Sequence, residues 1–83
     1  MKLLYFAWVR QKVGRSEETL DVPAGVKTVS ALVDYLVQRG PNYAAAFRDP
    51  KQLRCAVNQE HAGFEMAIGP DDEIAFFPPV TGG

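Results

Sequence analysis

Residues 28–41 read TVSALVDYLVQRGP, and this stretch decides the fold. Apolar residues recur in it at i, i+3, i+4, i+7 and i+8, which places them on one face of a helix. They are Val29, Leu32, Val33, Leu36 and Val37. Thr28 precedes them as a helix N-cap, and Gly40 followed by Pro41 is a strong stop signal. The stretch therefore predicts one amphipathic helix that packs on another layer.

The residues before this helix predict a β-hairpin. Residues 2–10, KLLYFAWVR, are rich in aliphatic and aromatic side chains, which favour a pleated and buried strand. Residues 14–16, GRS, interrupt the run, and residues 18–22, ETLDV, alternate polar with apolar side chains. Pro23 then ends the second strand, because proline cannot donate to a strand ladder.

The residues after the helix predict a short helical turn and two or three further strands. Residues 43–47 fit one helical turn, and residues 53–57 alternate in the manner of a strand. Residues 62–68 are a weaker strand candidate. Residues 73–77, EIAFF, predict the last strand, which two prolines end.

This order of elements predicts a two-layer α+β roll, because one helix covers only one face of a sheet. The best-known arrangement of this kind is the β-grasp fold, here with a mixed sheet of four to five strands and one main helix. We expect residues 1–77 to form this single domain and residues 78–83 to form a flexible C-terminal tail.

Composition and charge exclude several classes of function. The chain has 83 residues, and nine basic against ten acidic residues give a net charge of −1, without a basic surface for nucleic acid. No apolar run approaches the ~20 residues that span a bilayer, and no cleavage site of a signal peptide follows the N-terminal apolar run. The lone Cys55 allows no internal disulfide. We therefore expect a cytoplasmic protein that binds neither nucleic acid nor membrane.

The first and last predicted strands are apolar on both sides. A sheet covered by one helix should turn its other face to water, yet neither strand supplies a polar side. Phe77 and one set of residues from the first strand are therefore expected to form an exposed apolar patch, which usually marks a partner site. The alternative is that a loop or the short second helix covers this face.

Few side chains suggest catalysis. Cys55 lies in the alternation of a strand, which favours a core position over a reactive thiol. His61 is the sole histidine and has no second ligand at metal-binding spacing, so we interpret it as a surface residue. The acidic residues 71–73 beside Gly69-Pro70 are typical of a turn. The side chains predict no metal site and no enzyme acting alone.

The end of the sequence is the better candidate. Gly82-Gly83 follow Pro78-Pro79 and the short linker Val80-Thr81. Six residues span up to about 20 Å at ~3.3 Å each, and glycines pass through narrow channels. A terminal carboxylate has a pKa of ~3.3–3.7 in peptides, so at neutral pH it is ionised and a poor electrophile. A mixed anhydride with AMP would activate it for attack by sulfur, which would yield a thiocarboxylate.

The ending DDEIAFFPPVTGG, residues 71–83, resembles the small, sulfur-carrying subunit of molybdopterin synthase. The opening KLLYFAWVRQKVG, the helix TVSALVDYLVQRG and the segment CAVNQE support the resemblance in the same order along the chain. The resemblance covers essentially the whole chain, and FFPPVTGG is its most specific part. It implies the β-grasp fold, in agreement with the order of elements.

The resemblance also implies a mechanism. A ubiquitin-activating-like adenylating enzyme uses ATP to adenylate Gly83, which then receives sulfur from a donor protein as a thiocarboxylate. The large synthase subunit takes the tail and transfers the sulfur to cyclic pyranopterin monophosphate, building the dithiolene of molybdopterin in a heterotetramer. Gly82, Thr81 and Val80 form the tail, and no cofactor is bound permanently. The segment that docks on partners is Phe76, Phe77, Pro78 and Pro79.

Three other readings of the sequence remain open. One is the sulfur carrier of thiamine thiazole synthesis, which shares the fold and the Gly-Gly ending. Another is a ubiquitin-like modifier that is joined through Gly83 to lysines of target proteins. The third is a binding module whose Gly-Gly ending has no function, for which loss of Gly83 would leave function intact.

Overall fold

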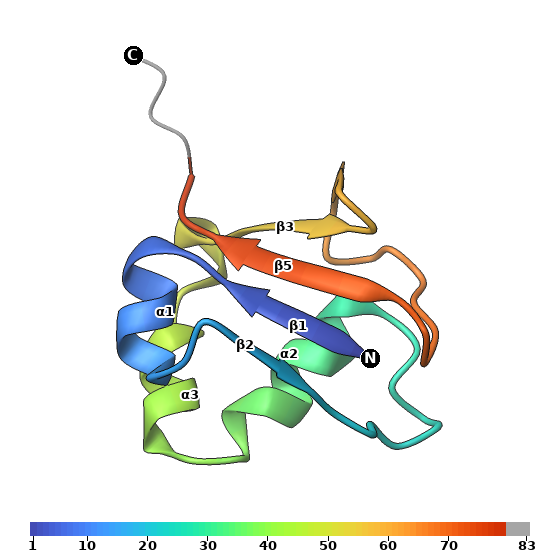
Figure 1. Ribbon diagram of the computed structural model, residues 1–83, viewed down its shortest axis with the longest axis horizontal. Coiled ribbons are helices and arrows are strands. Elements are labelled where there is room, and N and C mark those ends of the chain that lie inside the picture. Colours follow the sequence, from blue (N-terminus) through green and yellow to red (C-terminus); the bar gives the residue numbers. More distant parts are fainter. Residues whose placement is uncertain (80–83) are drawn as a thin grey trace.

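A single mixed sheet organises the fold in the computed structural model, which describes residues 1–79 (Figure 1). Its strand order is β2-β1-β5-β3-β4, with β1 and β5 parallel and the other neighbours antiparallel. The strands are β1 (Lys2–Tyr5), β2 (Glu17–Thr19), β3 (Arg54–Val57), β4 (Glu60–Ala62) and β5 (Glu73–Phe77). The helices are α1 (Ala7–Val13), α2 (Val29–Val37), α3 (Pro41–Ala46) and the 3₁₀ helix η1 (Pro50–Gln52). The predicted α+β class with a mixed five-stranded sheet is confirmed.

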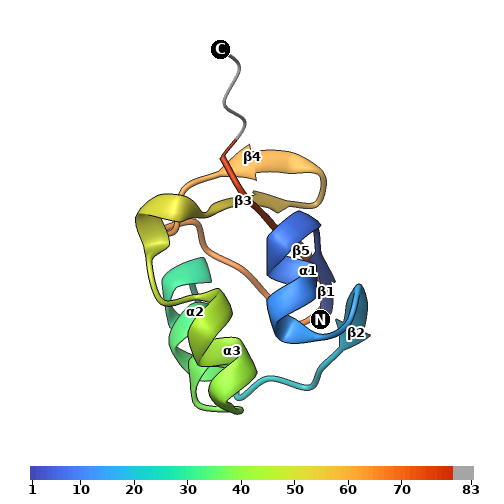
Figure 2. The same cartoon turned by 90° about the vertical axis from the view of Figure 1, so that its left-hand side faces the viewer.

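The predicted main helix is α2, and its stop and start signals act as expected. The Thr28 hydroxyl accepts a hydrogen bond from the Ala31 N–H at 3.1 Å, which satisfies one free donor of the first turn. Pro41 does more than end α2, because it also opens α3, where its missing N–H costs nothing. α3 packs on both α2 and α1, so the helices form one layer beside the sheet (Figure 2). The predicted short helix at residues 43–47 is thus confirmed, beginning two residues earlier.

The core lies between this helical layer and the two central strands. Alternate residues of β1 and β5 point into it and are fully buried or nearly so: Leu3, Tyr5, Ile74 and Phe76. α2 contributes Val29, Leu32 and Leu36, each with no exposed surface. Burying one large apolar side chain stabilises the fold by roughly 1.5–3 kcal/mol, so the helix–sheet contact is its main source of stability.

The first predicted strand is too long, and residues 7–13 are helical instead. Val9 and Val13 are buried one helical turn apart, and Gly14 ends the helix with a φ of 93°. β1 therefore reaches β2 through a helix, and the connection between the predicted hairpin strands is no tight turn. The run of Phe6, Ala7 and Trp8 favours a strand by composition, but packing of the two valines on the core decides otherwise.

The fourth strand was predicted in the wrong place. β4 lies at residues 60–62, and the preceding Asn58 and Gln59 both have positive φ, of 52° and 72°. Two such residues make the tight turn whose twist matches a β-hairpin. Residues 63–68 then leave the sheet, apart from one bridge between Thr28 and Ala67. The polar residues 58–61 therefore form a hairpin turn and the beginning of a short edge strand.

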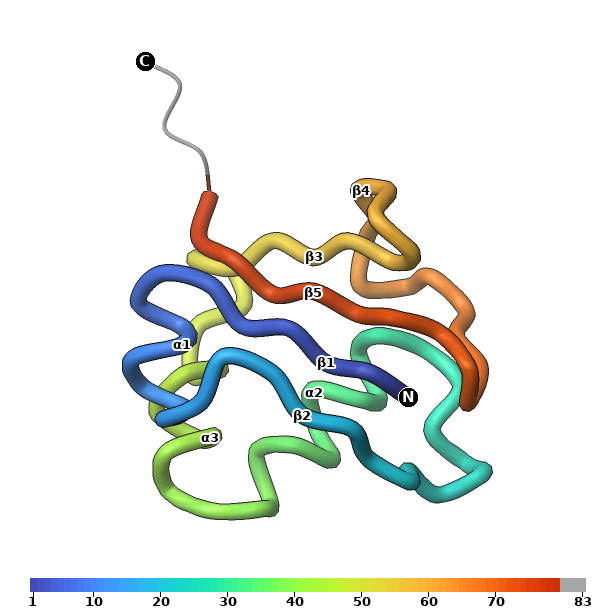
Figure 3. Tube along the Cα trace, in the orientation of Figure 1, coloured from blue at the N-terminus to red at the C-terminus, as the bar shows by residue number. Residues whose placement is uncertain are grey.

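The path of the chain brings distant segments to the same end of the sheet (Figure 3). β1 and β5 run in the same direction, so Tyr5 and Phe76 are partners near their carboxyl ends. Arg54, at the beginning of β3, lies opposite Phe77. Within residues 1–79, no helix has the length and apolar character needed to cross a membrane.

Candidate functional site

The carboxyl end of β5 is where the candidate tail begins. Phe77 is the last strand residue, and Pro78 and Pro79 follow it half-buried. Both prolines lack an N–H, so neither can extend the ladder with a neighbouring strand. The tail residues Val80, Thr81, Gly82 and Gly83 lie outside the described residues, so their expected roles stay predictions.

The two phenylalanines of β5 have opposite environments. Phe77 is half-buried on the face of the sheet away from the helices, as expected of a docking residue. Phe76 has no exposed surface, and its ring packs at 4.9 Å from the ring of Phe47 and at 6.4 Å from that of Tyr5. Phe76 therefore belongs to the core, and its assignment to a partner interface is wrong for the folded chain. Because successive side chains of a strand point to opposite faces of the sheet, Phe76 packs in the core and Phe77 lies on the outer face.

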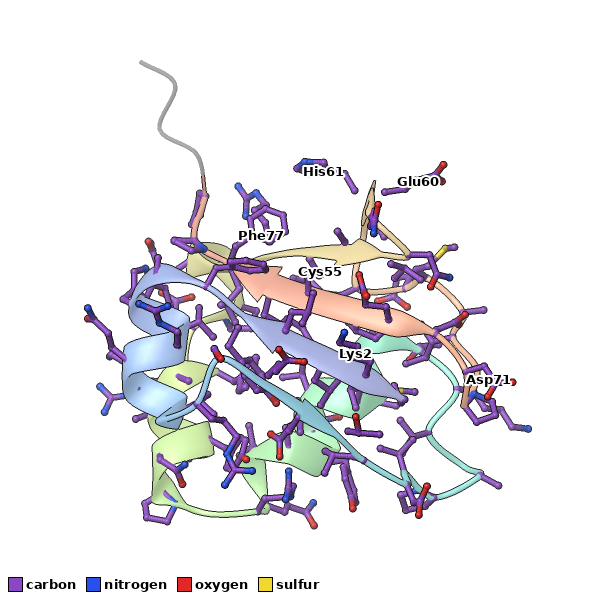
Figure 4. The ribbon with its side chains drawn as sticks, viewed as in Figure 1. Lys2, Cys55, Glu60, His61, Asp71 and Phe77 are labelled. Atoms are coloured by element: carbon purple, nitrogen blue, oxygen red, sulfur yellow. The ribbon has the colours of Figure 1, made fainter. Side chains whose placement is uncertain are left out.

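Three residues from other elements surround the end of β5. The His61 ring lies edge-on to the Phe77 ring at a centroid distance of 5.4 Å, which Figure 4 places at the carboxyl end of β5. Arg54 pairs with Phe77 across the ladder. Phe6 donates its backbone N–H to the Phe76 carbonyl at 3.1 Å, and 49% of its surface is exposed. Phe6 lies within the predicted first strand, but β1 ends at Tyr5, so the sequence did not place Phe6 at the end of β5.

The sheet face opposite the helices is apolar at its centre. Leu4, Ala75 and Ala56 are register partners across β1, β5 and β3, and Phe77 continues the strip toward the end of β5. Lys2 and Glu17 form an ion pair of 3.6 Å at the edge of this face. Leu4 of the first strand and Phe77 thus share one half-exposed face, as predicted, whereas Ala56 is buried; that this face binds a partner stays a prediction. No segment within residues 1–79 packs over this strip as a second layer.

The other candidate side chains have structural roles. The Cys55 thiol is buried and donates to the Ala62 carbonyl at 3.1 Å, and burial raises its pKa. Asp72 accepts hydrogen bonds from the Asn58 side chain and the Gly69 N–H, which lower its pKa and close the turn before β5. His61 is exposed, although it lies in a strand. In residues 1–79, no three potential metal ligands lie close enough together to bind an ion.

Glu18 is an enclosed carboxylate that no local pattern in the sequence indicated. Only 5% of its side chain is exposed. One carboxylate oxygen accepts from the hydroxyls of Tyr5 at 2.8 Å and Tyr43 at 2.7 Å, and the other pairs with Arg15 at 3.1 Å and Arg39 at 3.0 Å. Burial raises its pKa, but the hydrogen bonds from these donors outweigh that effect and lower it. All its partners belong to the fold, so Glu18 ties β2 to the core and to α3.

Replacing Glu18 with glutamine is expected to lower the free energy of unfolding by about 2 kcal/mol at pH 7. The amide nitrogen would face groups that donate, and it would carry no charge for Arg39. Because the folded-state pKa is lowered, this contribution is full above the unfolded value of ~4.3 and is lost as pH falls through the folded value. Urea unfolding followed by circular dichroism from pH 7 to pH 3 measures both effects.

Glu17→Gln is the matched control for this prediction. Glu17 lies next to Glu18 in β2, but its pair with Lys2 is exposed on both sides. Its loss should change stability by about 0.5 kcal/mol or less. Equal effects of the two substitutions at pH 7 would contradict the proposed structural role of Glu18.

The fold and the end of β5 define a ubiquitin-like β-grasp protein. The ThiS family model matches residues 3–83, and the chain belongs to this family. It is 42% identical over 83 residues to the molybdopterin synthase sulfur carrier subunit of Escherichia coli, covering 100% of this chain and 99% of that protein. It is 33% identical over 86 residues to the human protein of the same name, covering 100% and 93%. The resemblance seen in the sequence is confirmed.

Among solved structures, the chain is similar to small archaeal modifier protein 1 of Haloferax volcanii. The TM-score is 0.77 at 30% identity, with 96% of this chain and 97% of that chain covered. Proteins named as sulfur carrier and as modifier thus share this fold.

Proposed function

We propose that this chain is a sulfur carrier of molybdenum cofactor biosynthesis, acting as the small subunit of molybdopterin synthase. One observation carries the proposal: the sequence PPVTGG follows the last strand directly, in a chain that matches a sulfur carrier subunit at 42% identity over its whole length. The apolar strip beside the end of β5 supports it, because a carrier must dock where its tail is received.

In the proposed chemistry, the Gly83 carboxylate is the reactive group. An adenylating enzyme joins it to the α-phosphorus of ATP, which releases pyrophosphate and leaves an acyl-adenylate. Attack of sulfide on the carbonyl carbon expels AMP and leaves a thiocarboxylate; a persulfide donor needs in addition a thiol to reduce the acyl disulfide. In the large subunit, the thiocarboxylate sulfur then forms a bond to a carbon of cyclic pyranopterin monophosphate, and water cleaves the resulting thioester, which leaves the sulfur on the pterin and returns the Gly83 carboxylate; a second carrier repeats the transfer to complete the dithiolene. ATP is bound by the adenylating enzyme, and the carrier holds no permanent cofactor.

Docking is proposed to use the surface formed by Phe6, Phe77 and the strip of Leu4, Ala75 and Ala56. Phe6 is exposed, and Leu4, Ala75 and Phe77 are half-buried, so they leave apolar surface facing solvent around the position where the tail begins; Ala56 is buried beneath them. Burying such a surface stabilises a complex in proportion to its area, with aromatic residues contributing most. Pro78 and Pro79 would then direct the residues that follow into the partner.

The test is the intact mass of the purified chain after incubation with a molybdopterin-pathway adenylating enzyme, ATP and sulfide. We expect a gain that equals the exchange of one oxygen for one sulfur. Addition of the large subunit and cyclic pyranopterin monophosphate should then restore the original mass and produce molybdopterin. An unchanged mass with an enzyme that is active on a known carrier would contradict the proposal.

The same experiment separates the alternatives. If the thiocarboxylate forms but supports thiazole synthesis and no molybdopterin, the chain serves the thiamine pathway. The similarity to an archaeal modifier protein favours one further reading, in which Gly83 is joined to lysines. Isopeptide-linked products in cell extracts that retain this chain would identify that activity. We propose the cytoplasm as its location, where the adenylating enzyme and the sulfur donor protein would act.

A further inference from the structure

An open pocket of about 330 Å³ lies on the helical side of the molecule, apart from the apolar strip of the sheet. It is bounded by α1 on one side and by α3 and η1 on the other. Its lining consists of Trp8, Lys12, Ala45, Ala46, Arg48, Asp49 and Gln52. None of these residues was singled out in the sequence, and the proposed docking of the strip does not involve them.

The pocket combines an apolar wall with two cations. The Trp8 ring is half-buried, and the Lys12 ammonium lies 5.5 Å from its centroid. Neither Lys12 nor Arg48 forms an ion pair with a carboxylate of residues 1–79. Asp49 also lines the pocket and opposes these two cations with one negative charge; its Oδ1 accepts the Lys51 N–H at 3.0 Å and caps η1. The pocket therefore has two cations against one carboxylate, a net positive charge, beside an indole and two alanines.

The pocket lies at the end of the molecule where the tail begins. Trp8 is two residues beyond Phe6, whose N–H bonds to the Phe76 carbonyl. Gln52 is two residues before Arg54, which pairs with Phe77. α1 also contacts β5 directly. A protein that receives the tail and covers Phe77 would therefore also contact the pocket in the same interface.

Charge is distributed unevenly toward the same end. Residues 7–12 and 48–54 hold five basic residues and one acidic residue: Arg10, Lys12, Arg48, Lys51 and Arg54 against Asp49. The rest of the chain holds four basic and nine acidic residues. Figure 4 shows Asp71 at the opposite end of the sheet from Phe77. The end that must enter a partner is thus basic, although the whole chain has a net charge of −1.

We propose that this pocket receives an aspartate or glutamate side chain of the protein that takes the tail. The carboxylate pairs with Lys12 and Arg48, and its aliphatic stem lies against Trp8 and Ala45. Complementary charge at the edge of an apolar contact raises the association rate and fixes the orientation of docking. The choice of partner rests on the proposed function, whereas the pocket and its charge do not.

The test uses the full chain labelled with 5-fluorotryptophan, since Trp8 is its only tryptophan. On addition of the large subunit of molybdopterin synthase, the ¹⁹F resonance of Trp8 should shift. Calorimetry should give a Kd about tenfold weaker for Lys12→Glu, and a smaller loss for Lys12→Gln, which removes the charge without reversing it. The matched control is Lys27→Glu, an exposed lysine at the acidic end with the same change in charge; its Kd should change less than about twofold.

Two outcomes overturn the proposal in different ways. If the unmodified chain binds but Lys12→Glu and Lys27→Glu weaken binding equally and the ¹⁹F resonance does not move, the pocket is no contact site and the proposed function stands. If the unmodified chain does not bind the large subunit at all, the proposed function is wrong, and so is the proposal that this subunit supplies the acidic side chain. A saturable ¹⁹F shift on titration with AMP alone would show that the pocket binds a free nucleotide. It would overturn the proposal that an acidic side chain of the partner occupies it.

Discussion

A chain without Gly83 is expected to fold as before and to transfer no sulfur. The described core consists of residues from Met1 to Phe76, so the deletion removes none of its side chains. The new terminal carboxylate at Gly82 would be one residue, ~3.3 Å, short of the adenylating centre. A misplacement of even ~1 Å can cost ~100-fold in rate, so formation of the thiocarboxylate should fall below detection. Intact mass after incubation with adenylating enzyme, ATP and sulfide measures it.

Gly83→Ala is the matched variant, because it restores the length and adds only a methyl group. It should form some thiocarboxylate, at a rate well below that of the unmodified chain, since a channel shaped for glycine leaves little room for Cβ. Urea unfolding should give the same stability for all three chains. Full activity of the shortened chain would show that the Gly-Gly ending is not the reactive site.

The fold could be predicted from the sequence where the local pattern indicates only one type of secondary structure. α2 has an uninterrupted apolar stripe, a threonine cap and a Gly-Pro stop, and the structure follows each of them. β5 is a short apolar run ended by two prolines, which leaves a strand as the natural interpretation. In both cases the local preference and the tertiary packing favour the same structure.

The first ten residues show where local signals conflict. Phe6, Ala7 and Trp8 have the composition of a strand, but Val9 and Val13 recur at helical spacing and Gly14 supplies a helix end. Since aromatic content outweighed a stripe of only two valines, the helix was missed. The pocket beside α1 was missed with the helix, because Trp8 and Lys12 are four residues apart and are close neighbours only in a helix, whereas a strand would hold them about 13 Å apart.

The candidate site was predicted only in part, because some of its features depend on the tertiary fold. Sequence alone locates residues 76–79 at the end of the last strand but does not say which phenylalanine faces the helices. The register of β5 with β1 settles this, because Phe76 lies beside Tyr5 on the buried side. Glu18 was missed because its four donors come from β1, the segment before β2, α3 and the segment before α3, which only the tertiary fold brings together.

Replacing Phe76 and Phe77 separately with alanine should show that Phe76 mainly stabilises the fold and Phe77 mainly binds the partner. Phe76→Ala leaves a cavity between Phe47 and Tyr5 and is expected to lower the free energy of unfolding by about 3–5 kcal/mol. Phe77→Ala removes a half-buried ring and should cost about 1 kcal/mol or less. For binding to the large synthase subunit, we expect the opposite order, with Phe77→Ala causing the larger loss of affinity. Phe77→Ala should weaken Kd by roughly 30-fold, equivalent to ~2 kcal/mol, as is typical of an aromatic contact at an interface.

Urea unfolding and calorimetry on the same protein preparations measure the two effects. A domain of this size is stable by only about 5–10 kcal/mol, so the binding of Phe76→Ala must be measured at low temperature, where most molecules remain folded. Phe77→Leu supplies the control, because it keeps an apolar side chain and should recover part of the affinity. If Phe76→Ala weakened binding as much as Phe77→Ala while remaining folded, β5 would change its packing on docking. If Phe77→Ala bound normally, the apolar strip would not be the surface that the large subunit contacts.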